Sequence, residues 1–299
     1  GAFRLLDVTP LALRLPSAIA GILTALAAYW LGCELITKEE ERRKKENGAS
    51  SFFLLSSSLI PLLAALYVAT SYWHVHFSRF GIRGVFTPLC GALAFAAFWR
   101  AVNRRSTGWF AVAGFWLGLA LHFYTASRFF PFFLAGFLLV EWLVARLTRR
   151  PALLPQHWRG ILVLYVVAAL VFAPLGLYFV QHPGSFAQRA SAVTALTSES
   201  PLARMAQAAL ANVLQFSVPG RGDQEQFYNL PGRAVFDPLT ALLALVGLAV
   251  LLWRWRSGPA LFLLLWFPAL LLPSFLATDR WPTLPRVLGV IPGVYFFPA

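Results

Sequence analysis

The hydrophobic positions of this chain gather into long runs that recur along the whole sequence, with short polar segments between them. The runs cover residues 11–36, 52–72, 85–102, 109–123, 129–145, 160–180, 239–253 and 259–276, and a further run starts near residue 287. An α-helix needs about 20 apolar residues to cross the ~30 Å hydrocarbon core of a bilayer, and irregular backbone cannot face lipid. The pattern therefore predicts an all-α polytopic transmembrane helix bundle with about nine spans.

One polar segment, residues 181–238, is much longer than the others. Its middle part, residues 201–216, carries apolar side chains at helical spacing, so we expect an amphipathic helix that lies along the membrane interface. Long loops with structure of their own are often functional lids. We therefore expect a single transmembrane domain over residues 1–299, with the loop 181–238 inserted between two spans.

Composition and charge support this prediction and give it an orientation. Hydrophobic residues make up 59% of the chain, charged residues 12%, and the mean hydropathy is +0.66, which is far outside the soluble range. Fourteen of the 25 basic residues, including all three lysines, lie in the segments 37–51, 100–108, 146–159 and 253–258. Because cytoplasmic loops collect Lys and Arg, we expect these segments in the cytoplasm and the loop 181–238 outside. Topology then explains much of the +13 net charge, and no nucleic-acid partner is expected.

Five arginines fall in short segments on the predicted outer side, where basic residues are scarce: Arg79, Arg83, Arg128, Arg280 and Arg286. A guanidinium at mid-bilayer costs roughly 2.5–3.5 kcal/mol on insertion scales, and less near the membrane edge. Its planar set of donors matches the oxygens of a phosphate or carboxylate two at a time. These arginines therefore suggest an anionic, lipid-borne substrate at the outer leaflet.

Two pairs of side chains on this side have helical spacing. Arg79 and Arg83 are four residues apart, as are Tyr124 and Arg128. In a continuous helix each pair would share one face and could bind a single anion. The alternative is that the arginines extend to lipid head groups and Tyr124 belongs to an aromatic belt. Asp223 lies in the turn-rich part of the long loop, where it could cover the site.

Metal-binding patterns are weak. His74 and His76 have no carboxylate or cysteine beside them, so an interfacial pair is the better interpretation. Cys33 and Cys90 lie within apolar runs, which favours packing over a disulfide or a metal site. We therefore expect no cofactor, while a divalent metal stays an open alternative.

Several short motifs occur in an order that is similar to that of a known family. They are residues 10–21 (PLALRLPSAIAG), 73–83 (WHVHFSRFGIR), 114–128 (GFWLGLALHFYTASR), 222–223 (GD), 229–232 (NLPG) and 285–289 (PRVLG). In order and topology they resemble bacterial members of the dolichyl-phosphate-mannose protein mannosyltransferase-like group, which are multi-span glycosyltransferases of the GT-C fold. The resemblance covers nearly the whole chain.

This resemblance implies a transferase that moves a sugar from a polyprenyl-phosphate donor to a hydroxyl on a protein, lipid or glycan acceptor. It also implies an active site on the outer face of the plasma membrane of a bacterium-like cell. Arg79 matches the family's Ser-Arg position best, which implies contact with the donor phosphate. The further candidates for substrate binding are Arg83, Tyr124, Arg128, Asp223 and Arg286. The family's catalytic carboxylate lies in the first outer loop, so we expect the general base upstream of Gly1 in a longer chain.

The main alternative is a transporter or flippase for polyprenyl lipids or solutes, which would also have many spans and basic residues near a head-group site. Ion-coupled carriers usually place carboxylates at mid-membrane. Here Glu34 and Glu141, the acidic residues near spans, lie at predicted cytoplasmic ends. A membrane scaffold without catalytic activity is a third possibility.

Overall fold

The structure is a computed structural model that describes residues 9–47, 51–184, 200–276 and 281–299, with side chains described in these ranges except at 37–58. Arg280, one of the five outer arginines, lies outside these residues. Eight of the predicted apolar runs form α-helices. They are α2 (Pro10–Asn47), α3 (Ser51–Thr70), α5 (Phe86–Arg104), α6 (Thr107–Phe123), α7 (Phe129–Leu147), α8 (Leu153–Gln181), α11 (Pro238–Trp253) and α12 (Gly258–Phe275). The prediction of an all-α bundle holds throughout the described residues.

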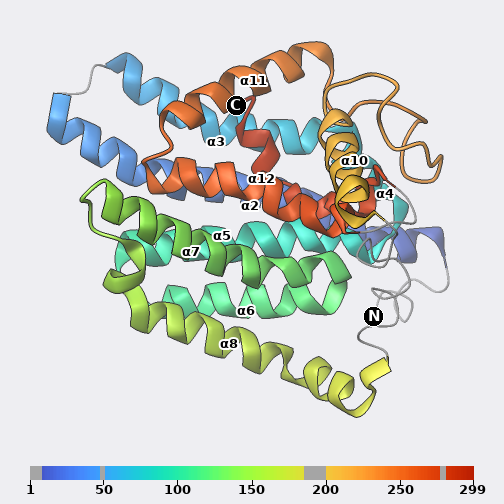
Figure 1. The fold of residues 1–299 in the computed structure, drawn as a ribbon, viewed down its shortest axis with the longest axis horizontal. Helices are drawn as coiled ribbons and strands as arrows, with labels where there is room; N and C mark the ends of the chain where they lie inside the picture. Colours follow the sequence, from blue (N-terminus) through green and yellow to red (C-terminus); the bar gives the residue numbers. More distant parts are fainter. Residues whose placement is uncertain (1–8, 48–50, 185–199, 277–280) are drawn as a thin grey trace.

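Consecutive helices of the bundle are antiparallel because the turns between them are short. The turns of α5–α6, α7–α8 and α11–α12, residues 105–106, 148–152 and 254–257, lie together at the left of Figure 1, and we call this the hairpin end. The right of Figure 1 carries residues 71–87, 123–129 and 281–290, and we call it the loop end. The segments predicted to be cytoplasmic thus gather at the hairpin end, and those predicted to be outside gather at the loop end.

Two glycines set the contact between α6 and α8. A Cβ atom at Gly114 would lie 2.2 Å from the carbonyl oxygen of Leu164, and one at Gly118 would lie 2.5 Å from that of Ala168. Small residues four apart let the backbones of membrane helices approach closely. The glycine spacing within the motif 114–128 therefore serves helix packing.

An aromatic cluster occupies the region where α5, α7 and α12 meet. The ring of Phe95 on α5 lies edge to face against Phe133 of α7, with centroids 5.3 Å apart, and against Trp266 of α12 at 4.7 Å. Edge-to-face pairs contribute about 0.5–1.5 kcal/mol each beyond their area burial. The cluster holds α5 in place, and the N-terminus of α5 is where the candidate site lies.

The predicted number of about nine spans is not confirmed. Among the described residues, five helices are long and apolar enough to cross a membrane, and three shorter apolar helices accompany them. The run near residue 287 forms two 3-10 helices, η4 (Leu284–Val290) and η5 (Gly293–Phe296), instead of a membrane helix. Its apolar side chains are buried in protein, and Trp266 Nε1 donates to the carbonyl oxygen of Gly289 at 2.9 Å. Pro292, which lacks an N–H, separates the two short helices.

The carboxylates of Glu34 and Glu141 are held in polar contacts at the hairpin end. Glu34 accepts hydrogen bonds from Arg100 at 2.8 Å and from Asn103 at 3.1 Å. Glu141, which is fully buried, accepts from Arg150 at 2.6 Å, and its second oxygen accepts from the backbone of Leu153. The bond from Arg100 thus joins α5 to Glu34 of α2, and the bonds to Glu141 hold the turn 148–152 and the start of α8 against α7.

Candidate functional site

Three short 3-10 helices meet at the N-terminus of α5, at the loop end. They are η1 (Arg83–Val85), η2 (Thr125–Arg128) and η4. All three pack against α5, and η4 packs against both η1 and η2. A buried hydrogen bond of 3.0 Å between the hydroxyls of Thr87 and Ser127 joins the first turn of α5 to η2. Each 3-10 helix carries one of the predicted arginines, Arg83, Arg128 or Arg286. The structure therefore gathers at one end three residues from a stretch of about 200 positions in sequence.

Arg79 lies beside this group in the last turn of α4 (Tyr72–Phe80), and its side chain is exposed. The helix ends at Phe80 because Gly81 has the left-handed conformation, with φ of 78°. Arg79 and Arg83 therefore do not share one face of a continuous helix, and the predicted helical spacing is wrong for this pair. Both guanidinium groups are exposed, and neither forms an ion pair within the described part of the chain.

The pair Tyr124 and Arg128 also departs from the predicted spacing. Tyr124 is extended, with φ of −147° and ψ of 145°, and it separates α6 from η2. The two side chains are therefore not on one helix. The guanidinium of Arg128 instead lies 5.0 Å from the ring centroid of Phe179 on α8, a cation–π contact that fixes its position.

Asp223 is buried and holds the long loop against η4. One carboxylate oxygen accepts from the backbone N–H of Leu284 at 2.9 Å, and the other accepts from that of Glu225 at 3.0 Å. A Cβ atom at Gly222 would lie 1.9 Å from the carbonyl oxygen of Arg233, so only glycine fits before Asp223. The motif at 222–223 therefore has a structural basis, and the carboxylate lies under the surface of the loop.

His74 and His76 have separate partners. His74 is buried, and its Nε2 lies 3.1 Å from the carbonyl oxygen of Gly21. Burial lowers the pKa of His74, since desolvation disfavours the imidazolium. His76 Nε2 lies 2.9 Å from the carbonyl oxygen of Phe227 in the long loop. Among the described residues, no group of three or more His, Cys, Asp or Glu side chains is arranged to hold a metal ion.

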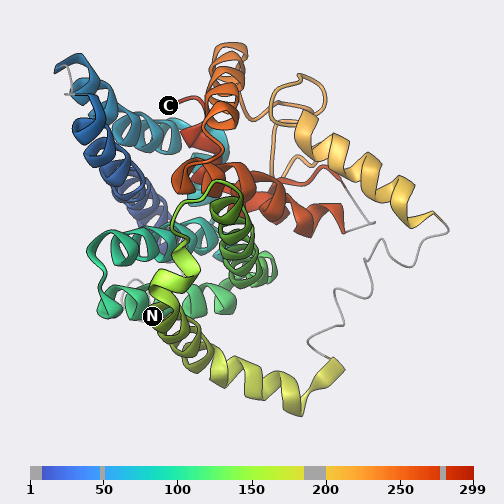
Figure 2. The ribbon, with the colours of Figure 1, turned by 60° about the vertical axis from the view of Figure 1, so that its left-hand side comes forward.

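The amphipathic helix predicted in the long loop is α10 (Pro201–Leu214). It packs against α12 and extends from the bundle at the loop end (Figure 2). Leu202, Leu210 and Val213 are exposed, whereas Asn212 is buried. Exposed apolar side chains on a helix of this kind fit the predicted position along the membrane interface.

Aromatic contacts that the sequence did not single out fasten the loop to α4. The ring of Tyr228 stacks on Phe77 with centroids 6.0 Å apart, and the guanidinium of Arg233 lies 4.1 Å from the ring centroid of Tyr72. The sequence offered one indication of these contacts, namely that Phe227, Tyr228 and Arg233 lie close together around the NLPG motif. These contacts place the loop over α4, next to Arg79.

The architecture just described occurs in solved structures of a membrane glycosyltransferase. The Archaeoglobus fulgidus oligosaccharyltransferase tethered with an acceptor peptide containing the NVT sequon matches 96% of this chain and 38% of its own, with a TM-score of 0.60 and 17% identity. Archaeal oligosaccharyltransferase AglB from Archaeoglobus fulgidus, in complex with an inhibitory peptide and a dolichol-phosphate, matches 99% and 40%, with a TM-score of 0.61 and 17% identity.

These matches define the class of the fold. The chain is a helical membrane protein with the GT-C fold, and it shares that fold with the archaeal oligosaccharyltransferase AglB. It spans about two fifths of the length of these structures. No protein-family model matches the chain, and no curated protein matches it significantly.

Proposed function

We propose that this protein is a membrane glycosyltransferase that moves a sugar from a polyprenyl-phosphate donor to a hydroxyl acceptor. The reaction is assigned to the loop end, which faces away from the cytoplasm. The observation that carries the proposal is the gathering of Arg83, Arg128 and Arg286 on three adjoining 3-10 helices, with Arg79 beside them, on a GT-C fold. One solved structure of this fold has a tethered acceptor peptide, and another is in complex with an inhibitory peptide and a dolichol-phosphate. They make a lipid phosphate and a polypeptide the first donor and acceptor to test.

The chemistry divides into two requirements. The acceptor oxygen attacks the anomeric carbon, its proton passes to a general base, and the bond from that carbon to the phosphate oxygen breaks. The departing polyprenyl phosphate gains negative charge, which guanidinium groups stabilise through charge-assisted hydrogen bonds. Arg79, with Arg83, Arg128 or Arg286, stabilises the departing phosphate in this way. We assign no general base among the described residues.

Asp223 and Tyr124 take different parts in this proposal. Asp223 is a positioning residue, because its bond to the backbone of Leu284 holds η4 and therefore Arg286. Tyr124 is half-buried next to η2, where its hydroxyl is a candidate contact for a sugar or phosphate oxygen. The polar contacts of Glu34 and Glu141 count against an ion-coupled carrier, because both carboxylates are engaged with arginines at the hairpin end.

The test is sugar transfer from a polyprenyl-phosphate sugar by the full-length protein. Arg79→Ala is expected to lower kcat/KM by roughly 10- to 150-fold, since a charge-assisted hydrogen bond contributes about 1.5–3 kcal/mol. Arg256→Ala is the matched control, because Arg256 is an exposed arginine at the hairpin end that stacks on Trp255. Equal kcat/KM values for the two variants would contradict the phosphate role of Arg79. Movement of the polyprenyl lipid across the vesicle membrane without any sugar transfer would favour the flippase instead.

A further inference from the structure

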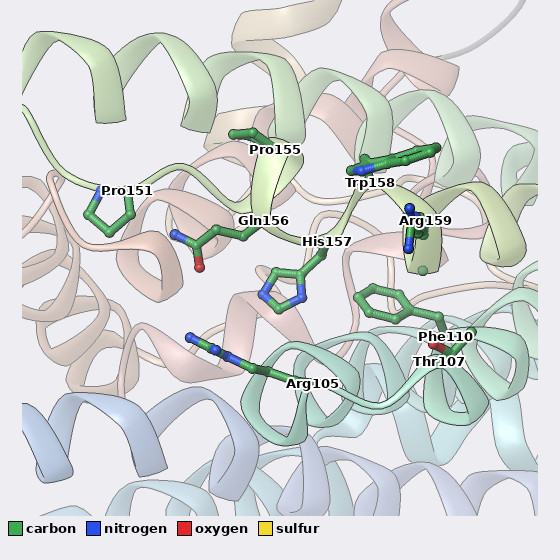
Figure 3. A pocket seen from close by; sticks show the side chains of 10 residues that line it. Arg105, Thr107, Phe110, Pro151, Pro155, Gln156, His157, Trp158 and Arg159 are labelled. Carbon is green, nitrogen blue, oxygen red and sulfur yellow. The ribbon is translucent and has the colours of Figure 1, made fainter.

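A cavity of about 600 Å³ lies at the hairpin end, between the first turns of α6 and α8. It is on the opposite side of the bundle from the arginines of the loop end, so the proposed transferase chemistry does not use it. Polar side chains from both helices line it, together with Phe110 (Figure 3). Its position at the membrane boundary makes it accessible to lipid head groups of one leaflet.

The backbone on both sides of the cavity departs from regular helix. Arg105, which ends α5, has a positive φ of 52°, a conformation that costs a non-glycine residue roughly 1–2 kcal/mol. His157 has φ of −124° and ψ of 15° within α8, and the helix kinks there. A Cβ atom at Gly160 would lie 2.2 Å from the ring of Phe110, so the glycine lets α8 approach α6 just C-terminal to the kink. These features bring Arg105 and His157 to one cavity.

The lining of the cavity is cationic. Arg105 and Arg159 contribute guanidinium groups, and none of the residues that line it, all within the described ranges, is acidic. Figure 3 shows the side chains of Arg105, Gln156 and His157 directed towards a common space. Guanidinium, amide and imidazole donors in this arrangement suit the oxygens of a phosphate.

An apolar stripe leads from the cavity along α8. Trp158, Leu162, Val166 and Leu170 are four residues apart and exposed, so they line one side of the helix. Only 22% of the apolar window of α8 is buried within the protein, the lowest share among the five candidate spans. The guanidinium of Arg159 lies 5.2 Å from the ring centroid of Trp158, an aromatic and cationic pair of the kind found at head-group depth.

We propose that the cavity binds the phosphate group of an anionic phospholipid from the leaflet at the hairpin end, while an acyl chain lies along the stripe on α8. Arg105, which points towards the same space as Gln156 and His157, binds the phosphate oxygens (Figure 3). Arg159, which lies on the other side of His157 beside Trp158, attracts the negative charge of the head group. Basic pockets between membrane helices are known to take such head groups. The lipid would join the first turns of α6 and α8, which both line the cavity.

The test is a titration of purified full-length protein in mild detergent with phosphatidylglycerol, phosphatidylcholine or glycerol 1-phosphate, followed by the midpoint of thermal unfolding. Phosphatidylglycerol is expected to raise the midpoint, and the double variant Arg105→Ala and Arg159→Ala is expected to bind it at least tenfold more weakly. Arg104→Ala is the matched control, because Arg104 is exposed at the end of α5 and does not line the cavity.

Three outcomes would overturn the proposal. The first is an equal effect of phosphatidylcholine, and the second is unchanged binding by the double variant. The third is binding of glycerol 1-phosphate as tight as that of phosphatidylglycerol, which would identify a soluble phosphoester as the ligand. If the alanine variant fails to fold, Arg105→Gln with Arg159→Gln carries the same test, because glutamine keeps a long polar side chain while it removes the charge.

Discussion

Asp223 is buried, and each of its carboxylate oxygens accepts a hydrogen bond from a backbone N–H, that of Leu284 or of Glu225. Removal of the carboxylate leaves a buried N–H without an acceptor, which costs about 1–3 kcal/mol. Asp223→Ala is therefore expected to lower the free energy of unfolding by this amount and to expose the loop to proteolysis. Chemical unfolding and limited proteolysis of the purified protein measure the two effects.

Gln226→Ala serves as the control for this prediction, because Gln226 is an exposed residue of the same loop. Its effect on the free energy of unfolding should stay within about 0.5 kcal/mol. If Asp223→Ala unfolds like Gln226→Ala, Asp223 does not anchor the loop. A transfer rate that falls while stability is unchanged would instead indicate direct contact with the substrate.

His74 gives the protein a pH-dependent contribution to stability. Burial lowers its pKa below the ordinary value of 6.5, so below about pH 6.5 the unfolded chain binds more protons at this residue than the folded protein. Stability therefore falls as the pH decreases, by at most roughly 1.4 kcal/mol per pH unit. His74→Gln keeps a donor for the carbonyl oxygen of Gly21 and removes the titration. Unfolding free energies near pH 7.5 and 5.5 should change less for the variant, and equal changes would contradict this assignment.

The helices of the bundle could be predicted from the sequence because lipid and protein interior both select apolar side chains, and long apolar runs are visible without an alignment. The breaks next to the site could not. Gly81 ends α4 where the chain packs against Leu13, and Tyr124 becomes extended between α6 and η2. Neither break has a signal in the apolar periodicity, so helical spacing predicted pairs of side chains that the fold separates.

The contact of α6 with α8 offers a test at the scale of an element. A Cβ atom at Gly114 would meet the carbonyl oxygen of Leu164 at 2.2 Å, and backbone cannot move aside as a flexible side chain does. Gly114→Ala is expected to push the helices apart and to destabilise the protein by about 1–3 kcal/mol. Gly136→Ala in α7 is the control, because nothing lies within 4 Å of a Cβ atom there and alanine favours helix. Unfolding in detergent compares the two, and equal stability would contradict close backbone packing.

At the scale of the molecule, the sequence predicted which residues share an end of the bundle, and the structure confirms that grouping. Alternating spans place every second connection on the same side, so Arg83, Arg128 and Arg286 had to come to one end once the spans were known. The local structure around these arginines consists of three 3-10 helices and the hydrogen bond between Asp223 and Leu284. Neither feature could be predicted from the periodicity of apolar residues. The apolar run that starts near residue 287 was counted among the spans for a related reason: burial inside protein and exposure to lipid select the same side chains.

The orientation of the whole bundle is a prediction from its charge and is open to a direct test. Most basic residues of the chain belong to segments at the hairpin end, which predicts that this end lies in the cytoplasm. The test uses cells that make a full-length variant in which every cysteine, including Cys33 and Cys90, is replaced by alanine. Gln226→Cys should then react with an impermeant maleimide in intact cells, whereas Arg256→Cys should react only after permeabilisation, since both positions are exposed. The reverse pattern would put the loop-end arginines in the cytoplasm and contradict a transferase that acts on the outer face, while the fold and the lipid cavity would stand.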